Sequence, residues 1–162
     1  MGNDMVRSQT IQVGDFLNKA VIYLSEYLNE ITISSLQTEE TGEEKYYKEL
    51  LSNLRRLTVY CEEGYEACQM ILQSTPFRKP AAEKTLYRIY HTCVEEFFNP
   101  KHDVWYEDSR SAYTGKNAIK FRAGTPLSLK KLMATLESEF QIIREELEFY
   151  ETDYRTKMIQ SK

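Results

Sequence analysis

The sequence is poor in the residues that make turns, bind metals and cross-link chains. Its 162 residues include only 6 Gly, 4 Pro, 3 Cys, 2 His and 1 Trp. Scarce Gly and Pro argue against a turn-rich β fold and favour long helices. The Cys residues are odd in number and show no CxxC spacing, so we expect reduced thiols in a cytoplasmic protein rather than a disulfide framework.

Long hydrophobic runs are also missing. No apolar run approaches the roughly 20 residues that a membrane span requires. The N-terminus MGNDMVRSQT lacks the basic and apolar regions of a signal peptide, so we expect a cytoplasmic protein with no membrane segment. The net charge of −4 and the isoelectric point of about 5.4 argue against a general nucleic-acid binder, because such proteins carry a basic face.

Four segments repeat apolar residues at spacings of three and four, which is typical of the buried face of an amphipathic helix. They cover approximately residues 4–33, 41–74, 80–98 and 125–158. Helices of this kind with mostly short connections predict an all-α fold, an antiparallel four-helix bundle. At this length the chain is most simply one domain, residues 1–162.

Local signals place the expected helix ends. Thr41 and Glu44 match a capping box, so the second helix should start there after a loop over residues 37–42. Thr125–Pro126 supplies a cap and a first-turn proline for the fourth helix. Gly64 lies inside the second helix at a cost of about 1 kcal/mol relative to Ala. Close approach of a neighbouring helix would explain that cost.

The fourth helix keeps its apolar stripe almost to the end of the chain. If it extends beyond its partners, Tyr150, Tyr154 and Met158 are exposed and need a second chain to cover them. A homodimer through the fourth helix is therefore a secondary prediction.

Residues 99–125 interrupt the helical pattern between the third and fourth helices. Val104–Tyr106 and Ala118–Phe121 are rich in residues that favour strands, and Thr114–Asn117 between them has a turn composition. We predict a structured loop or a small β-hairpin in this insert, anchored by Trp105. Since the third helix is short, the insert should cover what that helix leaves bare.

The insert is basic, although the protein is acidic. From Ser109 to Arg122 there are four basic residues and no acidic one. The rest of the chain holds the other 17 basic residues and all 25 acidic residues, a balance of −8, so anions would concentrate at the insert. The candidate residues for binding a ligand or partner are Trp105, Arg110, Tyr113, Lys116, Asn117, Lys120 and Arg122. The alternative is structural: Arg110 and Lys116 pair with nearby acids and only hold the loop down.

Known catalytic and metal-binding patterns do not fit. Gly115–Lys116 is not a P-loop, because Arg110 and Asn117 stand where that motif needs Gly and Ser or Thr. His91 and Glu95 share one helix face, but the paired Glu-x-x-His motifs of a di-iron bundle are absent from the sequence. We therefore assign no metal, no cofactor and no catalytic residue, and the question of enzymatic activity stays open.

The cysteines fall on the apolar stripes of the second and third helices. They are Cys61, Cys68 and Cys93. Together they could face one core and hold zinc, but no fourth ligand is evident. Buried cysteines that act as small apolar residues fit the pattern better.

Several stretches carry a resemblance to a known family. They are LTVYCEEG (57–64), EKTLYRIYH (83–91), the loop from Trp105 to Phe121, and YETDYRTK (150–157). They resemble the YpuI-like family of proteins of unknown function from spore-forming Gram-positive bacteria. The resemblance covers most of the chain and implies a bacterial cytoplasmic protein. It supplies no activity and no catalytic residues.

Two classes of function follow from the sequence. The first is a non-catalytic binding or regulatory module whose partner surface includes the basic residues 109–122. The alternative is a protein, which could be an enzyme, that binds a nucleotide or another phosphate-containing small molecule in the same insert. An unknown protein partner predicts a broad, shallow surface there. A small anionic ligand predicts a concave pocket with converging cationic groups.

Overall fold

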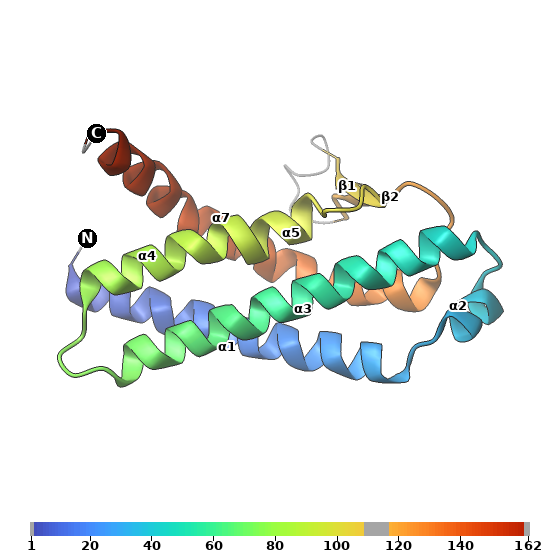
Figure 1. The fold of residues 1–162 in the computed structure, drawn as a ribbon, viewed down its shortest axis with the longest axis horizontal. Coiled ribbons are helices and arrows are strands. Elements are labelled where there is room, and N and C mark those ends of the chain that lie inside the picture. The colour runs from blue at the N-terminus through green and yellow to red at the C-terminus, as the bar shows by residue number, and fades with distance from the viewer. Residues whose placement is uncertain (1, 109–116, 161–162) are drawn as a thin grey trace.

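The computed structural model describes residues 2–108 and 117–160 and is mostly helical (Figure 1). The three longest helices are α1 (Asn3–Glu30), α3 (Glu44–Gln73) and α7 (Leu127–Gln160). Between α3 and α7 runs a shorter rod made of α4 (Lys79–Ile89), η1 (Tyr90–Val94) and α5 (Glu95–Phe98). Figure 1 shows these segments lying along one axis, each reversing the direction of the one before. The mostly helical fold predicted from the apolar periodicity is confirmed.

The expected count of four helices is not confirmed, because a short helix α2 (Ile33–Glu39) follows α1. It occupies part of the segment assigned to the first helix and to the loop over residues 37–42. Thr32 and Ser35 stabilise the start of α2 by capping each other's backbone N–H groups. The Ser35 N–H donates to the Thr32 hydroxyl at 3.0 Å, and the Thr32 N–H donates to the Ser35 hydroxyl at 2.9 Å.

The capping box expected at Thr41 and Glu44 does not form. Helix α3 does begin at Glu44, but its N-cap residue is Glu43, whose side chain makes no capping hydrogen bond. The turn between α2 and α3 is held instead by Tyr47, a residue within α3. Tyr47 is fully buried, and its hydroxyl donates to the Glu40 carbonyl at 2.5 Å.

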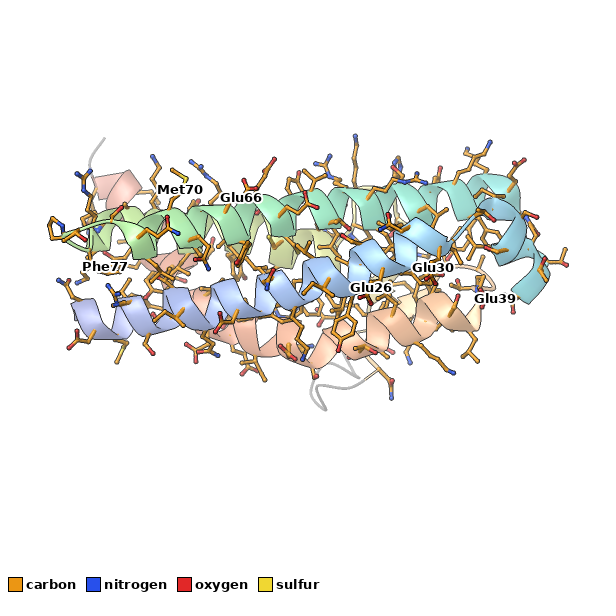
Figure 2. The ribbon with its side chains drawn as sticks, turned by 90° about the horizontal axis from the view of Figure 1, so that it is seen from below. Glu26, Glu30, Glu39, Glu66, Met70 and Phe77 are labelled. Carbon is orange, nitrogen blue, oxygen red and sulfur yellow. The ribbon has the colours of Figure 1, made fainter. Side chains whose placement is uncertain are left out.

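The start of α7 is capped from a distant part of the chain rather than by Thr125. The Thr125 hydroxyl donates to the carbonyl of Ala123 at 3.0 Å. The carboxylate of Glu39 in α2 accepts from the Ser128 N–H at 3.1 Å and from the Ser128 hydroxyl at 2.7 Å. Figure 2 shows Glu39 at the end of the bundle where α7 begins. A carboxylate there satisfies free N–H groups and also complements the helix dipole.

The third helical rod is continuous but contains the π-helical turn η1. A π turn inserts one extra residue per turn, so neighbouring residues can share the buried face of the rod. Ile89, Cys93 and Phe97 are buried at a spacing of four, and Val94 and Phe98 beside them are buried as well. Simple three-and-four spacing does not reveal such a turn.

Gly64 lies where three helices meet. A Cβ atom at this position would lie 2.8 Å from Leu17 Cδ1 of α1 and 3.2 Å from Ile89 Cγ1 of α4. The close approach expected at this glycine is therefore present.

The insert contains the predicted hairpin. Strands β1 (Trp105–Glu107) and β2 (Ile119–Phe121) pair antiparallel, with Trp105 opposite Phe121 and Glu107 opposite Ile119. Within the described residues, no helix is long and apolar enough to cross a membrane.

Tyr150, which the dimer prediction expected to be exposed, is buried within the chain. Tyr150 is only 1% exposed, and its hydroxyl donates to the Gln9 side chain of α1. Burial raises the pKa of Tyr150 to about 12. The side chains of Tyr154 and Met158 lie outside the described residues, and the homodimer stays a prediction.

We expect Gly64→Val to destabilise the protein, because its branched side chain must displace the Leu17 and Ile89 contacts. The expected loss is about 2 kcal/mol beyond that of Glu62→Val. Glu62 is an exposed residue of the same helix, so its substitution carries the β-branching cost without the clash. Urea unfolding of both variants measures the difference, and equal midpoints would refute the close packing at Gly64.

Candidate functional site

The insert is attached to the core through Trp105. This side chain is fully buried, and its indole N–H donates to the carbonyl of Phe97 at 2.8 Å, close to the end of α5. The hydrogen bond satisfies both the indole and a carbonyl of the last helical turn. Trp105 thus anchors the hairpin, as expected, and has no exposed surface to offer a ligand.

Helix α3 holds the N-terminal part of the insert. Asn53 is fully buried; its amide nitrogen donates to the His102 carbonyl at 2.8 Å, and its amide oxygen accepts from the His102 N–H at 3.2 Å. Tyr46 lies about two helical turns before Asn53 in α3. Its hydroxyl donates to the Val104 carbonyl at 2.7 Å. These bonds place the chain before β1 directly on α3.

Helix α7 holds the other strand through a buried carboxylate. Glu137 is 3% exposed, and its two oxygens accept from the Ala118 N–H at 3.0 Å and the Ile119 N–H at 3.3 Å. Hydrogen bonds to an ionised acceptor are stronger than neutral ones. This contact fixes the start of β2 against α7.

A second charged contact joins α7 to β1. Arg144 Nη1 and Nη2 donate to the two carboxylate oxygens of Glu107 at 2.8 and 2.7 Å, and Nη2 also donates to Gln141 at 2.6 Å. The guanidinium lies 3.9 Å from the ring centroid of Phe98. The Glu107 carboxylate raises the pKa of Arg144. Glu107 is thus engaged by α7.

The basic residues of the insert fall into different environments. Arg122 is neutralised within the insert, since it lies 3.2 Å from Asp103 Oδ1 and 4.1 Å from the ring centroid of Tyr106. Lys120 is half-buried and has no ion pair among the residues that the structure describes. The candidates Arg110, Tyr113 and Lys116 lie outside the described residues.

A cleft of about 310 Å³ lies between β2 and the first half of α7. We call it the hairpin cleft. Its apolar lining includes Ile119 and Met133, and its polar lining includes Asn117, Lys120 and Lys130. Asn117 has a φ of 55°, a left-handed conformation that Asn adopts more easily than most residues. The cleft therefore brings together two of the predicted candidates and adds Lys130 from α7.

Sequence reasoning missed the residues that α7 contributes. Lys130, Glu137 and Arg144 are spaced by seven residues, which places them on one side of a helix after every two turns. This polar stripe runs beside the apolar stripe of α7 and faces the hairpin. The spacing was visible in the sequence, but its partners were not.

The cysteines and His91 do not line the hairpin cleft. The three cysteines are buried and free, as predicted, and burial raises the pKa of Cys68 to about 12. His91 Nδ1 lies 3.8 Å from Glu95, and its Nε2 lies 3.8 Å from Glu151. Within residues 2–108 and 117–160, no group of three or more His, Cys, Asp or Glu is arranged to hold a metal ion.

Comparison with known proteins gives a family but no activity. A family model described as a protein of unknown function, DUF3907, matches residues 10–156. The uncharacterised protein YpuI of Bacillus subtilis (strain 168) is 48% identical over 151 residues, which cover 93% of this chain and 84% of that protein. No solved structure matches. The resemblance to YpuI-like proteins inferred from sequence segments is confirmed.

We expect Trp105→Phe to lower the free energy of unfolding by about 2–4 kcal/mol. The smaller ring leaves a cavity, and the Phe97 carbonyl loses its buried donor. Tyr106→Phe is the matched control, since the neighbouring side chain points to the more exposed side of β1 and should change stability by less than about 0.5 kcal/mol. Thermal unfolding compares the two, and similar melting temperatures would contradict the anchoring role of Trp105.

Proposed function

The chain belongs to the DUF3907 family of proteins of unknown function, and from this starting point we propose that it is a non-catalytic binding module. Its hairpin cleft receives an anionic segment of a partner protein. The observation that carries this proposal is the pair of lysines, Lys120 and Lys130, on the lining of one concave site. Neither has an ion pair within the described part of the chain.

The other cations near the hairpin have different roles. Arg122 is paired with Asp103, and Arg144 is paired with Glu107 through both terminal nitrogens. Such cations are already neutralised and fix the fold. Lys120 and Lys130 would lose no internal partner when an anion binds, so their charge is available for recognition.

The cleft is also prepared for binding before a partner arrives. Glu137 lines it, but both carboxylate oxygens are taken by the N–H groups of Ala118 and Ile119. These bonds fix β2, which carries Lys120, against α7, which carries Lys130. A site held rigid in advance loses less conformational entropy on binding. Apolar side chains such as Ile119 and Met133 add contact area for a peptide.

The concave shape also favours a second candidate, a small phosphate-containing ligand. A volume of about 310 Å³ lies at the lower end of the range for small-molecule sites. Two lysine ammonium groups can bind a phosphate group as point charges. This alternative places the ligand in the same cleft and on the same lysines.

We expect a fluorescein-labelled octapeptide of Glu and Ala to bind at low ionic strength, measured by fluorescence anisotropy. Lys120→Ala combined with Lys130→Ala should weaken binding by roughly tenfold, because each exposed charge pair contributes up to about 1 kcal/mol. Lys131→Ala is the matched control, since Lys131 is the exposed neighbour on α7 and does not line the cleft.

Inorganic pyrophosphate, tested on the same protein, distinguishes peptide binding from small-ligand binding. If inorganic pyrophosphate binds and the peptide does not, the small-ligand candidate replaces the peptide-binding one. If neither probe binds, or if Lys131→Ala weakens binding as much as the double substitution, the hairpin cleft is not the site.

A further inference from the structure

A second cleft, of about 360 Å³, opens where η1 and α5 meet β1 and α7. We call it the π-turn cleft. Its polar and aromatic lining includes Tyr90, Glu95, Asn99, Tyr106 and Arg144, and Val94 and Phe98 are its apolar residues. It shares no lining residue with the hairpin cleft.

The π-helical turn creates this arrangement. Tyr90 and Glu95 are five residues apart; on a regular α-helix of 3.6 residues per turn they would point about 140° apart. A π turn closes its hydrogen bonds between residues i and i+5, which brings this pair to the same side. Both side chains therefore line the one cleft. π-helical residues are well under about 1% of protein structure, and such turns are frequent at functional sites.

The polar groups in this cleft are largely unused. Within the part of the chain that the structure describes, the Tyr90 and Tyr106 hydroxyls and the side-chain amide of Asn99 make no hydrogen bond, whereas the Asn99 backbone N–H donates to the Glu95 carbonyl at 2.7 Å. The Glu95 carboxylate lies 3.8 Å from His91 Nδ1, which is too long for a hydrogen bond. Four groups that can accept hydrogen bonds thus line one open cleft without a side-chain hydrogen bond to any described residue, and three of them, Glu95, Asn99 and Tyr106, are exposed.

The charge in the cleft is negative. Arg144 is the one cation among its lining residues, and Glu107 neutralises it through two hydrogen bonds. Burial raises the pKa of Tyr90 most, and the carboxylates of Glu148 and Glu151 raise it further; Arg144 opposes them, and Glu95 adds to the rise. The same field that disfavours a tyrosinate favours a positive charge at this place.

We propose that the π-turn cleft binds a small organic cation of the alkylammonium class. The ammonium group donates to the Glu95 carboxylate and to the hydroxyl oxygens of Tyr90 and Tyr106. The alkyl chain lies along Val94 and Phe98. A divalent metal ion fits less well, because it needs several free oxygen ligands with charge, and Glu107 is already engaged by Arg144.

A diamine and a diol of equal length test the proposal on the whole chain. We expect 1,5-diaminopentane to shift backbone amide resonances of residues 90–99 and 105–107 in a two-dimensional NMR titration. The neutral 1,5-pentanediol should not shift them at the same concentration. Glu95→Gln should weaken diamine binding by at least about threefold, as expected for one partly exposed charge pair. Tyr90→Phe should weaken it as well, because the variant lacks the hydroxyl acceptor.

Two controls keep the outcome specific. Glu66→Gln changes an exposed carboxylate on α3 that does not line the cleft (Figure 2), so diamine binding should be unchanged. The double substitution of Lys120 and Lys130 should not weaken it either, because those residues line the other cleft. Equal shifts with the diol, no shifts at millimolar diamine, or equal binding by Glu95→Gln and the natural protein would each overturn the proposal.

Discussion

Two charged contacts from α7 hold the hairpin on the bundle, and both clefts depend on them. Glu137 accepts the N–H groups at the start of β2, and Arg144 holds Glu107 at the end of β1. A two-stranded hairpin is marginal in water by itself. With three residues in each strand, this one has few ladder hydrogen bonds. The side chains of α7 therefore add to the anchoring by Trp105 and to the hydrogen bonds from α3.

The same contacts border two clefts whose lining residues carry opposite charge. On the side of β2, Lys120 and Lys130 line the hairpin cleft and have no ion pair with any residue that the structure describes. On the side of β1, Glu107 neutralises Arg144 through two hydrogen bonds. Glu95 then leaves the π-turn cleft with a negative charge. The two sites that we propose, one for an anion and one for a cation, thus border a single hairpin fixed on one helix.

The sequence was informative where the signal was periodic, but local signals were only partly reliable, since the capping box expected at Thr41 and Glu44 does not form. The apolar stripes predicted the helices, the strand-favouring runs at Trp105 and Ile119 predicted the hairpin, and Gly64 predicted a close helix contact. Features set by distant partners were not accessible. Glu39 caps α7 across 89 residues of sequence, and no pattern around Thr125 indicates this. The π turn at Tyr90 is equally hidden, since one extra residue in a helical rod leaves the local composition unchanged.

The candidate site shows the same division. Lys120 and Asn117 could be chosen from the acid-free run of the insert, whereas Lys130 belongs to a helix whose charges look like an ordinary solvated face.

The central claim is that Glu137 holds β2 on α7. Hydrogen exchange of single amides, followed by NMR, tests it most directly. The Ala118 and Ile119 amides should exchange as slowly as those in the middle of α7, because a buried carboxylate protects them. Exchange at the rate of an exposed loop would contradict the account.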